Sequence, residues 1–180
     1  SGGSQFYCPD AKDWHAKDIK IYSNIFVGGK TPFSVGLAIN TDIANNTIVS
    51  PTTFVLRLLA DETIFENKNN TFTNNLFYLD ETIYFNGSSN AFNIDFPSIV
   101  FTNNLFYAAH NTGWTGPDPY GGDYDAEEIK GAQFINNIVA NPLFINLALA
   151  DFRSFTGICA GFGLKVYKFK IDYGYARYHL

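Results

Sequence analysis

Short runs of alternating apolar and polar residues recur along the chain, each built around an asparagine. The phrase occurs five times, as IKIYSNIF at 19–26, DIANNTIV at 42–49, TFTNNLFY at 71–78, VFTNNLFY at 100–107 and QFINNIVA at 133–140. Its last asparagine recurs at spacings of 22, 29, 29 and 33 residues, at Asn24, Asn46, Asn75, Asn104 and Asn137. A strand-like unit that recurs at this length predicts a solenoid, in which each unit buries its apolar face against its neighbours.

A second short apolar run follows the asparagine phrase in three repeats, as SVGLAI at 34–39, FVLRLL at 54–59 and ETIYF at 81–85. Two or three short strands in each repeat predict an all-β fold, a right-handed parallel β-helix of the single-stranded solenoid type. About six turns at about 4.8 Å each predict a stack about 30 Å long. Its interior is expected to hold one aliphatic column, made of Ile25, Ile48, Leu76, Leu105 and Ile138.

The asparagines of the phrase are expected to be architectural. Asparagine tolerates the left-handed backbone conformation of a tight bend better than most residues do. Stacked asparagine side chains also hydrogen-bond from one unit to the next, as they do in cross-β structures. The five equivalent asparagines are therefore predicted to form a ladder along the stack.

Two segments interrupt or end the repeat. The sequence GWTGPDPYGGDYDAEE at 113–128 is rich in glycine, proline and acidic residues, and it is predicted to project as a loop. Between Lys165 and Arg177 the chain alternates large apolar and polar residues, which is a strand pattern. The predicted organisation is a β-helix domain at 1–164 and a tail at 165–180, whose extra strand covers the helix or pairs with another chain.

Composition supports a folded β protein and narrows the range of partners. The chain is 46% hydrophobic and 16% charged, which excludes a disordered chain, and its 18 Phe and 11 Tyr favour strands. A net charge of −5 argues against nucleic acid as the main partner. No apolar run reaches the roughly 18 residues of a membrane span. Cys8 and Cys159 are expected near opposite ends of the stack, too far apart for a disulfide, and are predicted to be free thiols.

Three phrases carry a family resemblance: AKDIKIYSNIFVGG at 16–29, the two NNLFY phrases with the GWTGP that follows at 113–117, and NPLFINLALADFRSFTG at 141–157. Together they resemble bacterial secreted proteins with right-handed parallel β-helix repeats, in the pectate-lyase-like class. The likeness covers about residues 5–164 and departs from the usual pattern at Asn141, where an aspartate is common.

The resemblance implies a secreted or cell-surface protein, or a periplasmic one, with a polysaccharide as its partner. It also implies chemistry like that of a polysaccharide lyase. The earlier coils of such proteins are absent from this sequence. The chain is therefore expected to hold C-terminal coils and part of a site, with missing N-terminal coils or self-association completing the stack.

Candidate catalytic residues follow from the lyase reaction. A uronate lyase removes the proton next to a sugar carboxylate, which requires a cation on the carboxylate and a base nearby. Arg57 is the candidate cation, because its fork fits a carboxylate and stays charged. In FVLRLL it is predicted to point out of the coil, with an ion pair to Asp61 or Glu62 as the alternative. Lys30 and His15 are the candidate bases, with an ordinary surface position as the alternative for each.

The insertion at 113–128 supplies candidate sugar contacts. Aromatic faces stack on sugar rings, so Trp114, Tyr120 and Tyr124 are predicted to bind substrate, together with His110 just before the loop. A solvated loop is the alternative for the insertion, and a structural role is the alternative for His110. The acidic residues of the loop cluster in one segment, which disfavours a glycosidase pair on facing strands. Their oxygens suit a calcium ion, but their spacing matches no EF-hand, and no other cofactor or metal is expected.

Two functions are consistent with these features. The first is a polysaccharide lyase or part of one. The second is a non-catalytic surface, fibre or carbohydrate-binding module, which associates with itself through the strand edges of an uncapped end. No P-loop, Rossmann, zinc or nucleophile-elbow motif points to another activity.

Overall fold

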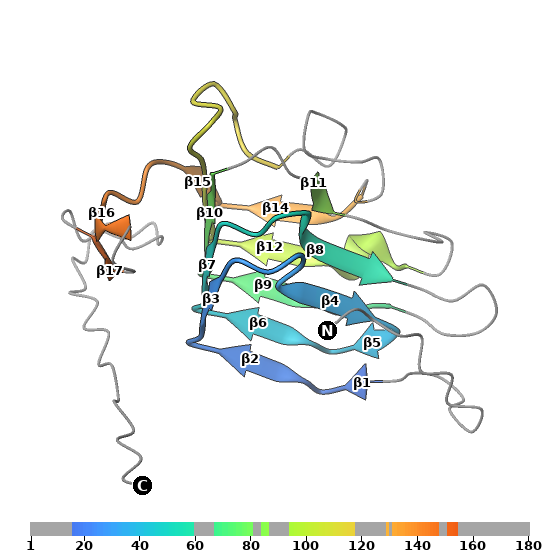
Figure 1. Cartoon of the computed structure of the whole chain (residues 1–180). Helices are drawn as coiled ribbons and strands as arrows, with labels where there is room; N and C mark the ends of the chain where they lie inside the picture. Colours follow the sequence, from blue (N-terminus) through green and yellow to red (C-terminus); the bar gives the residue numbers. More distant parts are fainter. Residues whose placement is uncertain are drawn as a thin grey trace, which may run out of the picture.

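The fold consists of short strands stacked in parallel sheets (Figure 1). The structure, a computed structural model, describes residues 16–59, 67–80, 84–86, 94–117, 129, 131–147 and 151–154. Two five-stranded sheets and one three-stranded sheet carry the repeats, and each strand pairs in parallel with the equivalent strand of the neighbouring repeat. The described chain is therefore all-β, and its pairing is consistent with a parallel solenoid.

Each asparagine phrase supplies one strand to each of the two larger sheets. The first sheet has the order β14-β12-β9-β6-β2 and the second has the order β15-β13-β10-β7-β3. The first contains β2 (Lys20–Tyr22), β6 (Asp42–Ala44), β9 (Thr71–Thr73), β12 (Val100–Thr102) and β14 (Gln133–Ile135). The second contains β3 (Ile25–Val27), β7 (Thr47–Val49), β10 (Leu76–Leu79), β13 (Leu105–Ala108) and β15 (Ile138–Val139).

The smaller sheets complete the described structure. The third sheet has the order β11-β8-β4, with β4 (Phe33–Gly36), β8 (Phe54–Leu59) and β11 (Tyr84–Asn86). A parallel pair consists of β1 (Ala16–Lys17) and β5 (Ala38–Ile39), and an antiparallel pair of β16 (Phe144–Asn146) and β17 (Asp151–Ser154). A 3-10 turn, η2 (Phe96–Ser98), precedes β12.

The chain bends from the first sheet into the second at each asparagine phrase. The residue just before the ladder asparagine has a left-handed φ of 57°, 57°, 55°, 55° and 53°, at Ser23, Asn45, Asn74, Asn103 and Asn136. Asparagine enters this region more easily than most residues, because its short polar side chain tolerates it. In each NN pair, the first asparagine therefore makes the bend and the second faces the interior.

The second asparagines form a ladder through the interior of the stack. In each step, the side-chain Nδ2 donates to the Oδ1 of the next asparagine at 3.2, 3.0, 3.1 and 3.0 Å, from Asn24 through Asn46, Asn75 and Asn104 to Asn137. The backbone N–H of the same residue donates to the same Oδ1 at 2.9, 3.0, 2.8 and 2.8 Å.

The amides of the ladder are buried but fully hydrogen-bonded. Asn46, Asn75 and Asn104 are at most 1% exposed. The second proton of each Nδ2 goes to a main-chain carbonyl of the preceding repeat at 2.9 Å, those of Ile21, Ile43 and Phe72. Since a buried amide without partners is costly, this arrangement favours one alignment of the repeats.

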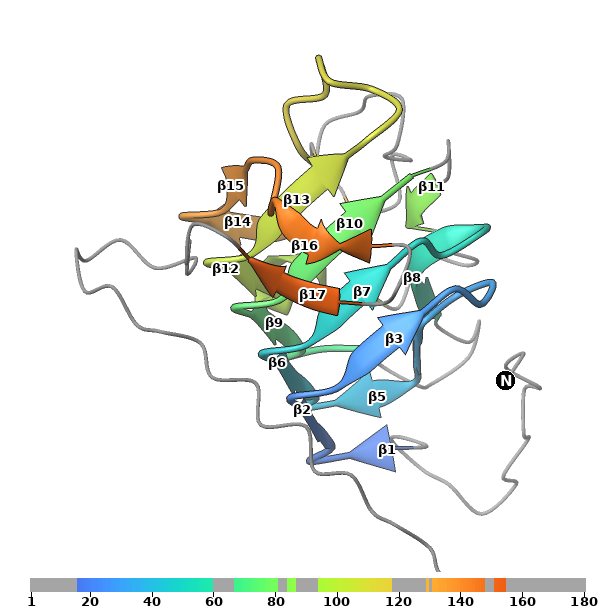
Figure 2. The ribbon, with the colours of Figure 1, turned by 60° about the vertical axis from the view of Figure 1, so that its left-hand side comes forward.

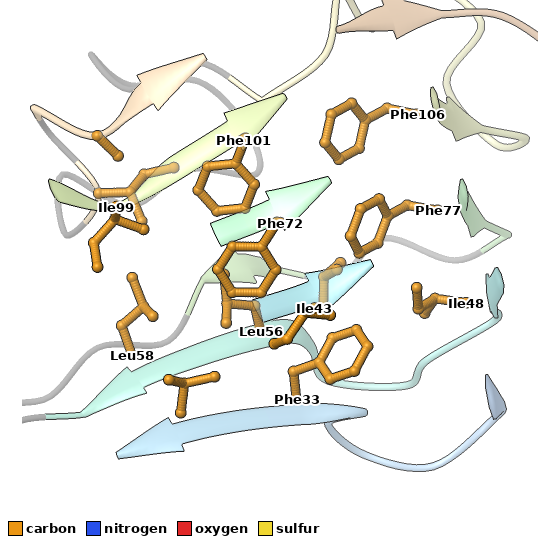
Figure 3. Close-up of a cluster of buried hydrophobic side chains, with 14 of the residues drawn as sticks. Phe33, Ile43, Ile48, Leu56, Leu58, Phe72, Phe77, Ile99, Phe101 and Phe106 are labelled. Carbon is orange, nitrogen blue, oxygen red and sulfur yellow. The ribbon is translucent and has the colours of Figure 1, made fainter. Parts of the chain in front are cut away.

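Two columns of inward-facing side chains, one from each larger sheet, pack in the core together with side chains of the third sheet (Figure 3). In the first sheet, the Phe72 and Phe101 rings are fully buried and stack with centroids 4.6 Å apart and planes 9° from parallel. In the second sheet, Phe77 and Phe106 stack at 4.9 Å and 11°. The ring spacing matches the spacing of paired strands, so each repeat adds one side chain to each column.

The predicted aliphatic column is wrong. Ile48 lies opposite Phe77, whereas the residue opposite Leu76 is Thr47. Because the ladder asparagine points inward, the next residue points outward and the one after it points inward again. The inward column of the second sheet is therefore Phe26, Ile48, Phe77, Phe106 and Val139. Of the predicted column, only Ile48 belongs to it, while Ile25, Leu76, Leu105 and Ile138 occupy the outward position.

A second bend, just before the first sheet, was not predicted from the sequence. Asp18, Asn40 and Asn69 have φ values of 56°, 59° and 54°. The Nδ2 of Asn40 donates to Asp18 Oδ1 at 2.9 Å, and that of Asn69 donates to Asn40 Oδ1 at 3.3 Å. On the inner side of the bend, Asn70 Oδ1 accepts the N–H of Thr41 at 2.8 Å. The sequence did contain a signal for this bend, since Asp18, Asn40 and Asn69 have the same spacing as the first three ladder asparagines.

The strands β16 and β17 lie over the outer face of the second sheet (Figure 2). Phe144 packs against Tyr78 with ring centroids 5.5 Å apart, and Asn141 Nδ2 donates to the hydroxyl of Tyr107 at 3.2 Å. This cover is consistent with Leu105 being 3% exposed although it points outward. A strand pair in this place was not predicted.

Four predictions fall wholly or partly outside the described residues. These are the free thiols of Cys8 and Cys159, the extra strand at 165–180, the part of the projecting loop at 118–128, and the domain boundary at residue 164. They stay predictions.

The corrected column predicts unequal effects for neighbours on β10. Phe77→Ala should lower the free energy of unfolding by about 3–5 kcal/mol, because it removes a fully buried ring from the stack. Leu76→Ala, at a half-buried outward position, should cost about 1–2 kcal/mol. Urea denaturation of both variants measures the difference, and equal losses would contradict this assignment of inward and outward positions.

The ladder predicts that an interior asparagine matters more than the terminal one. Asn75→Ala removes the acceptor of the Asn46 N–H and Nδ2, and it removes one donor each to the Ile43 carbonyl and to Asn104 Oδ1, so it should cost about 3 kcal/mol or more. Asn24→Ala, at the exposed end, should cost about 1 kcal/mol. Thermal and urea unfolding give both values, and a larger loss for Asn24→Ala would argue against the ladder.

Candidate functional site

Arg57 lies on β8, the central strand of the third sheet, and points away from the core. It pairs with the exposed Ser34 of β4, while its neighbours Leu56 and Leu58 are at most 1% exposed and face the core. Figure 3 shows both leucines among the core side chains. Since side chains alternate along a strand, Arg57 lies on the outer side of this sheet, as the sequence predicts.

The guanidinium of Arg57 is half-enclosed and incompletely hydrogen-bonded. Its central carbon lies 5.7 Å from the centroid of the Phe54 ring, within the range of a cation–π contact. Its Nε is buried and has no hydrogen-bond partner. An N–H that is buried without an acceptor is unfavourable, so an anion that supplied one would be stabilised here.

Across the described ranges, one other buried side-chain atom lacks a partner, the Oγ1 of Thr41. Thr41 is 4% exposed and belongs to the second bend inside the stack. Arg57, by contrast, is on the outer side and is half-buried. Of these two side chains, Arg57 is therefore the one that is partly exposed to solvent.

Lys30 lies beside the start of β8, the strand that carries Arg57. Its carbonyl oxygen accepts the N–H groups of Thr53 and Phe54 at 3.1 and 3.0 Å, and its side chain is exposed. Phe54 thus lies between the backbone of Lys30 and the guanidinium of Arg57. Two of the three predicted catalytic residues therefore border the third sheet, with the Lys30 carbonyl against the start of β8 and Arg57 three residues further along that strand. We call this region the Arg57 corner (Lys30, Ser34, Phe54 and Arg57). The third residue, His15, lies outside the described residues, as do Asp61 and Glu62.

The predicted sugar-contact residues lie elsewhere. Trp114 is half-buried and packs edge-on against Phe106 of the second sheet, with centroids 6.3 Å apart and planes at 79°. His110 is exposed on the same connection. The ring of Trp114 therefore takes part in core packing. A ring that binds a sugar would instead leave one face open to solvent. Tyr120 and Tyr124 lie outside the described residues.

The outer face of the first sheet carries a polar contact that the sequence analysis missed. The Tyr22 hydroxyl donates to the Asp42 carboxylate, and Thr71 Oγ1 donates to its other oxygen at 2.9 Å. The hydrogen bond to Asp42 is the main cause that raises the pKa of Tyr22 above its ordinary value. These residues occupy adjacent positions of successive repeats, so the strand register could have revealed them.

On the second sheet, the pKa of Tyr78 is raised above the ordinary tyrosine value. Partial burial is the largest cause, followed by the charges of Tyr107 and Asp80. The Tyr78 ring packs against Phe144 of β16, which lies over this face. Tyr78 thus stays a neutral phenol and serves packing.

No group of three or more His, Cys, Asp or Glu side chains in the described part of the chain is placed to hold a metal ion. The acidic side chains that suggested calcium, at 118–128, fall outside that part. Among the residues that the structure places, no helix has the length and apolar character needed to cross a bilayer. No protein-family model, curated protein or solved structure matches the chain.

Proposed function

We propose that the chain is a right-handed parallel β-helix that binds an acidic polysaccharide at the Arg57 corner and acts on it as a uronate lyase does. The observation that carries the proposal is the outward guanidinium of Arg57, with a buried Nε that lacks an acceptor. A sugar carboxylate would supply that acceptor and neutralise the charge. The Phe54 ring beside it offers an apolar surface for a sugar ring.

Parallel pairing and the asparagine ladder support the β-helix part of the proposal. Each asparagine phrase continues from the first sheet to the second through one left-handed residue, and the third sheet follows in the first three repeats. A coil of three strands per repeat accounts for this order. A polysaccharide substrate is consistent with a secreted or cell-surface protein, and this location is part of the proposal.

In the proposed reaction, Arg57 holds the uronate carboxylate and a base takes the proton from the adjacent carbon. The electron pair forms a carbon–carbon double bond, the glycosidic oxygen leaves, and that oxygen takes up a proton. Lys30, whose carbonyl accepts the N–H of Phe54, is one candidate base, and His15 is the other.

A second candidate function is binding without catalysis. It is favoured by the exposure of Lys30, because a solvated lysine is a poor base. The same corner would then hold acidic sugars without cleaving them.

Binding is tested by calorimetric titration of pectate, alginate and chondroitin sulfate, with neutral dextran as the negative control. Arg57→Met should weaken binding of the acidic polymer by about tenfold or more at low salt, because it removes the charge and keeps the aliphatic stem. Lys17→Met, which removes an exposed cation on β1, should leave affinity nearly unchanged. Arg57→Lys should restore only part of the affinity, because lysine lacks the planar fork.

Ultraviolet absorbance of the unsaturated product, followed in the same samples, separates the two candidate functions. Absorbance that grows with wild-type protein and is lost in Arg57→Met supports the lyase. Binding without product would leave the non-catalytic module. If none of the three acidic polymers binds, the proposed site is wrong.

A further inference from the structure

The two ends of the stack expose apolar side chains that the middle of the stack buries. Six large hydrophobic side chains in the described part of the chain are exposed, and all belong to the first repeat or to the last repeat and the residues just after it. They are Ile19, Tyr22 and Val27 at one end, 41%, 41% and 61% exposed, and Ile135, Val139 and Leu143 at the other, 42%, 41% and 43% exposed.

For Val139 and Ile19 the exposure comes from missing neighbours in the stack, whereas Tyr22, Val27 and Ile135 occupy outward positions at the two ends. Val139 continues the inward column of Phe77 and Phe106, which are at most 1% exposed. Ile19 directly follows the bend residue Asp18, and so stands where Thr41 and Asn70 stand in later repeats, which are 4% and 0% exposed. A further repeat on each end would bury these side chains.

The ladder ends in complementary hydrogen-bonding groups. At the first repeat, Asn24 Nδ2 donates to Tyr22 O and Asn46 Oδ1, and within the described structure no group donates to Asn24 Oδ1. At the last repeat, Asn137 Oδ1 accepts from Asn104, and Asn137 Nδ2 donates to Phe101 O. The backbone N–H of Asn137 and its second amide proton have no acceptor among the described residues. In every interior step, these are the groups that meet the Oδ1 of the next asparagine.

The edge strands at the two ends of the stack run in the same direction, so they can pair in parallel. β2 and β3 are the edges of the first and second sheets at one end, and β14 and β15 are the edges at the other. All pairing within both sheets is parallel. A second copy stacked in the same orientation would place β14 beside β2 and β15 beside β3, which extends both sheets together.

The existing register also fixes which side chains would meet. Continuing it by one step places Phe134 on Ile21, Ile135 beside Tyr22 and Asn137 on Asn24 of the next copy. The connection at 109–117, which projects beyond β13 in Figure 2, leaves Asn137 half-buried and Val139 41% exposed. The end of the ladder therefore remains open to a partner.

We propose that copies of this chain associate head to tail, with the β14–β15 end of one copy docked on the β2–β3 end of the next. The asparagine ladder and both core columns then continue across the contact. Because the contact joins two different surfaces, it does not close on itself, and it builds chains of increasing length. The proposal is independent of the carbohydrate site, since the Arg57 corner lies on the third sheet.

Sedimentation velocity of the whole chain over a wide concentration range tests the proposal. The average mass of the wild type should rise with concentration. Ile135→Lys at one end and Tyr22→Lys at the other should each weaken association by about tenfold or more, because each places a charge where Ile135 would lie beside Tyr22 of the next copy. Lysine at position 22 keeps a partner in Asp42, and circular dichroism confirms that both variants are folded.

Mixing the two end variants distinguishes the head-to-tail contact from other modes. Ile135→Lys keeps an intact β2–β3 end and Tyr22→Lys keeps an intact β14–β15 end, so their mixture should form a 1:1 dimer that neither forms alone. Thr73→Lys, in the same outward column but at the middle of the stack, is the matched control and should associate like the wild type.

Three results would overturn the proposal. One is a wild type that stays monomeric up to millimolar concentration. Another is association of Ile135→Lys by itself, which indicates a contact between two identical ends. The third is a mixture of folded variants that shows no dimer.

Discussion

The structure depends on the hydrogen bonds of asparagine side chains buried between successive repeats. Each interior amide uses both of its protons and accepts two N–H groups, so an inward polar side chain is tolerated at every bend. A slip of one residue would turn every inward side chain outward and leave these amides without partners. The ladder therefore holds the register, and the register in turn places the phenylalanine rings in columns.

The same register determines what the outer surfaces present. Arg57 is outward because Leu56 lies opposite Phe33 and Leu58 lies opposite Val35, all within the core. A cation on such a strand cannot turn inward without burying its charge, and the guanidinium lies over the Phe54 ring. The Arg57 corner thus combines a fixed position with an N–H that lacks an acceptor, which is the arrangement expected of an anion-binding group.

The sequence predicted the repeat, the parallel strands and the bend at the paired asparagines, because each depends on a residue that recurs at a regular spacing. The aliphatic column failed for a local reason. Ile48 was aligned with Leu76, although Thr47 lies opposite Leu76. Side chains alternate between the two faces of a strand, so an alignment error of one residue assigns a side chain to the wrong face. The second bend at Asp18, Asn40 and Asn69 was missed because its residues are not embedded in a repeated phrase. The outward direction of Arg57 was predictable from alternation, whereas its contact with Phe54 and its buried Nε depend on side-chain packing that the sequence does not show.

The most direct test of this account is amide hydrogen exchange, followed by NMR, at the ladder positions. The backbone N–H of Asn75, which donates to Asn104 Oδ1 at 2.8 Å, should exchange as slowly as the amides of the central strands. In Asn104→Ala it should exchange about tenfold faster or more, while the amides of the first repeat change little. Exchange at the rate of an exposed loop in the wild type, or no change in Asn104→Ala, would contradict the ladder and the register that follows from it.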